Sequence, residues 1–438
     1  MKHFISFFLL VLITSCGRPE INNPEDIIST NAKAVLFIPE IQKVYNLVPP
    51  QFQAAVLIFK AAVDDTKPLA FVMTSLEPPE AYFALPVKKG YEEQLKNAVE
   101  NFYIEESEVW SGYLFAAVRG SIPSSFGNKE FLPENKDALL FAKAQTEQLI
   151  KNNEAVLESY KKYKVLPVFR NLFSTELQKI FSYFTVHDFA EFLKQTEALT
   201  VALDDKALDI KCQLREGTDY AKEWTSMKDF LLPELPGTEA DMEFSFSVDA
   251  NKITFPLRGV ETGLKSYFVY KEKPEAVFPM DTVFEKLRES ARLKALGAFK
   301  VSEDRIGGEV ILEAEKGRAF YESFNKFCTA VRPFFISSWK LDDETKISEA
   351  KMWDFYLFGH HFDSEASLRA SEKQVALYYP GLGKNSISLK DSEEKGLFKA
   401  YFKPEKFFTL ETGIERVDMK LSVLENEINF KAAFKKKK

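Results

Sequence analysis

Cysteine and histidine are the side chains of this sequence best suited to nucleophilic or metal chemistry, and the chain holds three cysteines and four histidines. His360 and His361 are adjacent in a strand-like run, so their side chains point to opposite faces and do not bind one metal ion together. No His-Glu-x-x-His or Cys-x-x-Cys spacing is present. Cys16 differs, because it follows the small residues Thr14 and Ser15 at the end of an apolar run. We predict no catalytic, cofactor-binding or metal-binding residue and retain Cys16 as the candidate site.

The apolar run spans residues 4–13 and consists almost wholly of Phe, Leu, Val and Ile, after a short polar start at Lys2 and His3. Its length fits the core of a secretory signal, about 7–15 residues, and is too short to cross a bilayer as a helix. With Ile13-Thr14-Ser15-Cys16, the run resembles the type II signal peptide and lipobox of bacterial lipoproteins. The alternative is an ordinary secretory signal with a chance cysteine, or a buried helix.

The resemblance implies that residues 1–15 are a signal peptide, which is cut off just before Cys16. It also implies that Cys16 carries a diacylglyceryl thioether and becomes an acylated N-terminus, whose several acyl chains give stable anchoring. The implied location is the cell envelope, with the membrane as a partner through the lipid. Gly17, rather than Asp, follows the cysteine, which implies transfer to the outer membrane, on its periplasmic or surface side, if the source has two membranes.

The overall composition narrows the class of protein. A net charge of −7 argues against a nucleic-acid partner. Hydrophobic residues at 45% and charged residues at 28% are ordinary for a globular protein, and no later apolar run is long enough to span a membrane. Cys212 and Cys328 lie 116 residues apart, and two such cysteines do not form the disulfide framework of a small secreted domain. We predict that Cys212 is a buried thiol, with a disulfide as the alternative.

The chain is long enough for two domains after the signal is removed. Residues 16–30 contain turn formers and little periodicity, so we predict a lipidated N-terminus and tether, with folding beginning near Asn31. The Pro- and Gly-containing segment 232–237 is the best linker. We therefore predict a first α+β domain over residues 31–232 and a second over residues 238–438.

Two-residue alternation of apolar and polar side chains predicts hairpins at 109–118, 199–214, 242–257, 296–314 and 417–434. Each strand then has one apolar face and one solvated face. The predicted fold class is α+β, with antiparallel sheets built from hairpins and helices packed on one face. Four of the hairpins recur at intervals of roughly a hundred residues, which favours two similar halves made of repeated units. Antiparallel proteins without repeats show hairpins as well, so both interpretations stay open.

The sequence favours a membrane-anchored envelope lipoprotein with a non-catalytic binding or structural role, whose partner is an envelope protein or an apolar ligand. The 41 phenylalanines raise a first alternative, a carrier of lipid or another apolar ligand, although aromatic residues on alternating strands usually fill a core. The second alternative is a hydrolase with an unrecognised site, because carboxylate sites can assemble from distant segments. Seeing an enclosed apolar cavity would favour the carrier, and a cleft with converging acids or histidines would favour the enzyme.

Overall fold

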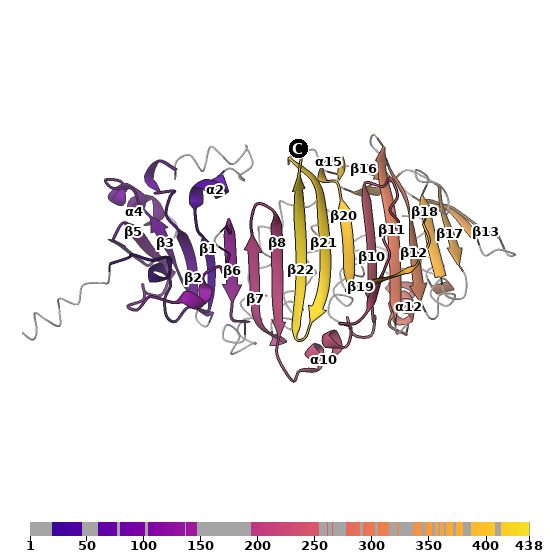
Figure 1. The fold of residues 1–438 in the computed structure, drawn as a ribbon, viewed down its shortest axis with the longest axis horizontal. Helices are drawn as coiled ribbons and strands as arrows, with labels where there is room; N and C mark the ends of the chain where they lie inside the picture. The colour runs from indigo at the N-terminus through magenta and orange to yellow at the C-terminus, as the bar shows by residue number, and fades with distance from the viewer. Residues whose placement is uncertain are drawn as a thin grey trace, which may run out of the picture. The chain divides into compact units, whose positions relative to one another are not determined.

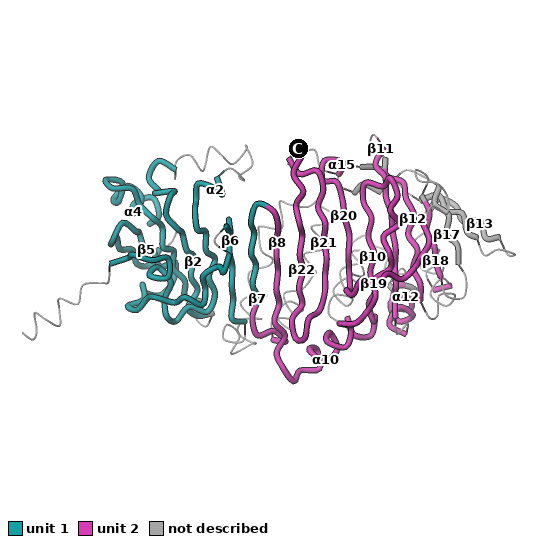
Figure 2. The backbone as a smooth tube through the Cα atoms, viewed as in Figure 1, with its two compact units in different colours: residues 1–152, 199–205 teal, residues 153–198, 206–438 magenta. Residues whose placement is uncertain are grey.

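The computed structural model (Figure 1) is organised as two compact units, coloured separately in Figure 2. Unit 1 comprises residues 1–152 and 199–205, and unit 2 comprises residues 153–198 and 206–438. The structure describes residues 20–45, 60–76, 79–100, 104–135, 137–146, 194–253, 261, 265, 277–289, 292–302, 305–314, 322–323, 336–342, 347–352, 355–357, 360–362, 365–370, 374–379, 387–407 and 413–437. Among the helices of these residues, none combines the length and apolar character needed to cross a membrane.

Unit 1 is an antiparallel sheet in the strand order β4-β5-β3-β2-β1-β6-β7. The strands are β1 (Ala34–Ile38), β2 (Leu69–Leu76), β3 (Pro79–Pro86), β4 (Glu106–Trp110), β5 (Tyr113–Arg119), β6 (Leu140–Ala144) and the part of β7 (Thr196–Leu203) from residue 199 onward. The helices are η1 (Pro24–Ile27), α2 (Ile41–Tyr45), α4 (Glu92–Glu100) and η2 (Lys129–Phe131).

Period-two alternation places the core of unit 1. In β1, Val35 and Phe37 are buried in a cluster with Tyr82 and Phe115, while the residues between them are half-buried. The Tyr82 hydroxyl accepts a hydrogen bond from the backbone N–H of Ser29 (2.7 Å) and donates one to the carbonyl of Ile27 (3.0 Å). A buried hydroxyl needs such partners, so Tyr82 ties the sheet to the segment that precedes β1.

That preceding segment differs from the predicted tether. Ile27 and Ile28 are completely buried, and η1 begins at Pro24 with Asn23 as its N-cap. The described chain is therefore already folded well before Asn31, where folding was predicted to begin. Turn-forming residues here build a short helix and its cap rather than a flexible linker, because two apolar side chains reach the core.

Unit 2 is an antiparallel sheet in the order β8-β22-β21-β20-β10-β11-β12-β18-β17-β14-β13, with β16 joined to β12 by a parallel contact and β15 paired to β16. The strands are β8 (Ala207–Leu214), β10 (Met242–Val248), β11 (Leu293–Ser302), β12 (Arg305–Ala314), β13 (Ile336–Asp342), β14 (Ile347–Met352), β15 (Phe355–Leu357), β16 (His360–Phe362), β17 (Glu365–Ala370), β18 (Gln374–Tyr379), β20 (Phe398–Phe402), β21 (Ile414–Leu424) and β22 (Glu427–Lys436). The helices are α10 (Asp219–Thr225), α12 (Val277–Glu289) and α15 (Pro404–Phe407). A separate two-stranded layer consists of β9 (Leu231–Pro233) and β19 (Asp391–Lys395).

The predicted antiparallel α+β character is confirmed at a coarse level, since the described residues are mostly antiparallel sheet with few helices. The hairpins at 109–118, 296–314 and 417–434 are present as β4–β5, β11–β12 and β21–β22. The prediction of a hairpin at 242–257 is wrong, because β10 pairs with β11 on one edge and with β20 on the other. A strand has two hydrogen-bonding edges, so none is left for a return strand after Asn251; residues 254–257 lie outside the described part of the chain.

The predicted boundary at residues 232–237 lies within unit 2. Pro233 is in β9, which pairs with β19, and the N–H of Glu234 donates to the carbonyl of Lys390 (2.7 Å). Pro233 stands at the end of this short strand, where a missing N–H is tolerated. The segment thus crosses the sheet of unit 2 as a second layer.

This layer changes which face of the sheet is buried. In β10, the polar residues Glu243, Ser245 and Ser247 are buried, whereas Phe244 and Phe246 are half-buried. We predicted the polar face of this strand to be solvated, and that prediction is wrong. The reason is local: residues 237–241 and β9 lie over it, so Glu243 is hydrogen-bonded to the backbone there instead of to water.

Candidate functional site

An open groove of about 1170 Å³ lies on the polar face of strands β8, β22, β21 and β20 of unit 2. Strand alternation explains its composition. In β21, Asp418 and Lys420 line the groove and the buried Val417 does not, although Met419 and Val423 also contribute to the lining. Lysines and acids line it in equal number, namely Lys211, Lys228, Lys395, Lys399, Lys420 and Lys431 against Asp209, Glu216, Asp229, Asp418, Glu425 and Glu427.

Ion pairs connect the charges within and beside the groove. Lys431 and Asp209 face each other across β22 and β8, with Nζ and Oδ1 3.5 Å apart. Lys395 and Asp229 form a closer pair of 2.7 Å at its border. Exposed pairs like these contribute little to stability, about 0–1 kcal/mol each, so they define a charge pattern more than they hold the fold.

Glu394 lies beside the groove between two lysines. Its carboxylate oxygens accept hydrogen bonds from Lys399 (2.5 Å) and Lys420 (2.8 Å), which project from the neighbouring strands β20 and β21. Partial burial alone would raise the pKa of Glu394, but the two ammonium groups outweigh it and the pKa lies below its ordinary value. Glu394 is therefore ionised at neutral pH and fixes both lysine side chains at this side of the groove.

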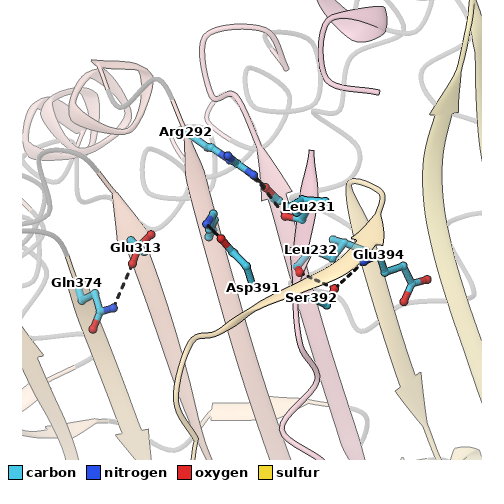
Figure 3. A network of polar contacts seen from close by, with 10 residues as sticks. Leu231, Leu232, Arg292, Glu313, Gln374, Asp391, Ser392 and Glu394 are labelled. Atoms are coloured by element: carbon cyan, nitrogen blue, oxygen red, sulfur yellow. Dashed lines mark hydrogen bonds and ion pairs between the residues drawn. The ribbon is translucent and has the colours of Figure 1, made fainter. Parts of the chain in front are cut away.

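The second layer positions Glu394, as the polar contacts in Figure 3 show. Within β19, Asp391 binds Lys294 of β11 with Oδ1 and Nζ 2.6 Å apart. The Ser392 hydroxyl donates to the carbonyl of Leu232 (2.8 Å) and accepts from the N–H of Glu394 (3.1 Å). Contacts at both ends of β19 thus hold this strand on the sheet and hold the carboxylate in place.

Asn429 of β22 is among the residues that line the groove. Its side-chain nitrogen is buried and has no hydrogen-bond partner within the described residues. In the sheet register it lies between Ser422 and Lys211. Because that nitrogen is buried, neighbouring atoms cover it and it is not presented to a ligand in the groove. The groove therefore offers charges of both signs.

The candidate residues from the sequence are not brought to this groove. Cys16 and Cys328 lie outside the described residues, and His360 and His361 are in β16, on the other side of the sheet order from β8. No group of three or more His, Cys, Asp or Glu able to hold a metal ion occurs in the described part of the chain. The groove could not be predicted from the sequence, because its lysines and acids come from segments about 200 residues apart. Taken alone, each segment has the pattern of a strand with a solvated face.

Cys212 is a buried free thiol, as predicted. Burial, with a smaller contribution from the Glu427 carboxylate, raises the pKa of Cys212 to about 12. Because the thiolate is the reactive form, Cys212 should stay unmodified in folded protein at pH 8 and react at least about 100-fold faster in urea. Peptide mapping after timed maleimide treatment measures both rates. Equal rates with and without urea would contradict the buried placement.

Comparisons with known proteins add little. No model of a known protein family and no curated protein sequence matches the chain. Among solved structures, crystal form I of TP0453 aligns with 45% of this chain and 76% of its own, at 10% sequence identity and a TM-score of 0.26. A superposition at that score carries no argument about fold or function.

Proposed function

We propose that this chain is a membrane-anchored lipoprotein of the cell envelope with a non-catalytic binding role. The observation that carries the proposal is the apolar run at residues 4–13 closed by Ile13-Thr14-Ser15-Cys16. Cys16 is the proposed site of acylation, and the membrane is the first partner. With Gly17 after the cysteine, the proposed destination in a source with two membranes is the outer membrane.

The groove on unit 2 supports a binding role. Its lining contains six lysines and six acids over about 1170 Å³, which suits an extended polar segment such as part of an envelope protein. The apolar hollow in unit 1, which includes Leu36, Phe71 and Val201, measures about 190 Å³. That is below the roughly 300–1,000 Å³ of typical small-ligand pockets, so this hollow does not support a lipid cargo.

We also propose that the hairpins belong to repeated units of roughly a hundred residues with helices on one face. Two contacts support the common face. Leu287 of α12 packs in the cluster that contains Phe246, and Phe407 of α15 packs in the cluster that contains Met242. Met242 and Phe246 are four residues apart in one strand and therefore point to the same side of the sheet.

Replacing Cys16 by alanine tests the anchor. In cells fed an alkyne-tagged fatty acid, the native chain should carry the tag and sediment with membranes, because the thiol is the acceptor of the first lipid. Cys16→Ala should lose the tag and keep residues 1–15, or leave the membrane fraction. The matched control is Cys212→Ala, which removes a buried thiol and should keep both tag and sedimentation. A processed, acylated Cys16→Ala protein would refute the proposal.

A further inference from the structure

The described chain begins at Glu20, and the next residue is already fixed to unit 1. The N–H of Ile21 donates to the hydroxyl of Ser111 (3.1 Å), in the turn between β4 and β5. The Ile21 side chain is half-buried and packs against the core cluster that also includes Trp110 and Phe126. The chain thus enters unit 1 at the β4–β5 turn.

The residues after Ile21 hold this entry point in place. The N–H groups of Asn22 and Asn23 both donate to the Asp26 carboxylate, at 3.0 and 2.8 Å. Ile27 and Ile28 are then completely buried. Because a cap, a helical turn and two core side chains follow in succession, the position of Ile21 is set by the fold of unit 1.

The distance from this entry point to Cys16 is short. Five residue steps separate Cys16 from Ile21, and a fully extended chain of that length reaches at most about 18 Å. If Cys16 is acylated as proposed above, its lipid lies in the bilayer surface. The β4–β5 turn is then always within about 18 Å of the lipid headgroups.

We propose that the lipid anchor orients unit 1, with the β4–β5 turn facing the phosphate-bearing headgroups of the membrane. Charges near the turn agree with this partner. Lys67 Nζ lies 3.2 Å from where a Cβ on Gly112 would stand. Lys88 is next in sequence to Val87, whose N–H donates to the carbonyl of Gly112, and its own Nζ donates to the carbonyl of Lys60 (3.0 Å). Asp64, 3.4 Å from Lys67, and Asp65 are the acids of this loop. Lysines near an anionic lipid surface are attracted to it.

The opposite end of the same sheet carries glutamates as well as basic residues. β5 ends at Arg119, six residues and about 20 Å from Tyr113. There, Glu105 accepts from the N–H of Gly120 (2.8 Å), and the side chain of Glu80 lies against Gly120. Carboxylates are disfavoured next to anionic headgroups, but Arg119 and Lys33 accompany them at this end, so the short chain between Cys16 and Ile21 favours the orientation more than the charges do.

Depth measurements on the lipidated full chain test the orientation. In a background with Cys212 and Cys328 replaced by alanine, a fluorophore is placed by Lys67→Cys or by Arg119→Cys, and the protein is reconstituted in vesicles of phosphatidylethanolamine and phosphatidylglycerol containing nitroxide-headgroup lipid. Acylated Cys16 has no free thiol and takes no label. Because the two positions differ by about 20 Å, we expect at least about threefold stronger quenching at position 67. Lys88→Cys and Glu80→Cys form a second pair of positions in case one variant fails to fold.

A longer linker is the matched control. Ten Gly/Ser residues inserted between Gly17 and Arg18 add a random coil of about 18 Å, and the quenching ratio should fall toward one. Equal quenching at both positions in the native-length chain, with acylation of Cys16 verified by mass, would overturn the orientation and leave the anchored lipoprotein standing. Absence of acyl groups on Cys16 would instead overturn the proposed function, and the orientation with it.

Discussion

Glu243→Ala is expected to lower the free energy of unfolding of unit 2 by about 2–3 kcal/mol. The Glu243 side chain is almost completely buried and accepts hydrogen bonds from the N–H of Gly237 (3.2 Å), the N–H of Thr238 (2.7 Å) and the Thr238 hydroxyl (2.8 Å). Alanine would remove the common acceptor of all three donors, of which those on Thr238 are half-buried and that on Gly237 is exposed. Urea unfolding, together with hydrogen exchange at Gly237 and Thr238, measures the loss globally and locally.

Glu239→Ala is the matched control, because it removes a glutamate from the same segment. Its side chain is 95% exposed, and its carboxylate lies 3.7 Å from Lys300. The free energy of unfolding should change by no more than about 0.5 kcal/mol. If the two variants unfold at the same urea concentration, Glu243 does not hold the second layer on the sheet.

The contrast between Glu243 and its neighbours explains one limit of prediction from this sequence. Alternation along residues 242–248 identifies a strand with two different faces, and that is what the structure contains. Alternation does not say what lies over each face. Glu243 is buried because a segment before the strand returns across it, and such a crossing depends on tertiary contacts.

The N-terminal segment shows a second limit. Residues 20–30 have few apolar side chains, and turn formers dominate, so the segment resembles a linker. Ile27 and Ile28 nevertheless fill the core, and the Tyr82 hydroxyl bonds the backbone beside them. Two adjacent apolar residues carry no periodic signal, so only the folded sheet shows where they pack.

The groove could be predicted only in part. Each of its strands, such as β21 with Asp418 and Lys420, is recognisable from its pattern. The order of β8, β22, β21 and β20 brings together residues about 200 positions apart, and no local signal specifies that order. Hairpin partners are predictable because the turn fixes them; strand neighbours joined by long connections are not.

The aromatic residues of unit 2 pack in part over glycines. Phe244 lies directly opposite Gly297, and Phe299 lies opposite Gly308, in the pairs β10–β11 and β11–β12. The two rings are stacked with centroids 6.2 Å apart. A glycine leaves room on the sheet surface for a ring from the next strand. Part of the phenylalanine content is thereby explained as packing.

Gly308→Ala is expected to destabilise unit 2 by about 3 kcal/mol, whereas Gly297→Ala should be rescued by a second substitution. A Cβ on Gly308 would clash with the backbone carbonyl oxygen of Ala298, which cannot move without breaking the β11–β12 pairing. The three atoms nearest to a Cβ on Gly297 all belong to the ring of Phe244, and a side chain can be replaced. Phe244→Leu should therefore restore stability to Gly297→Ala but not to Gly308→Ala. Urea unfolding of the three single variants and the two double variants with Phe244→Leu measures the coupling between each glycine and Phe244. Rescue of both glycine variants by Phe244→Leu would show that the sheet backbone shifts to accommodate the Cβ on residue 308.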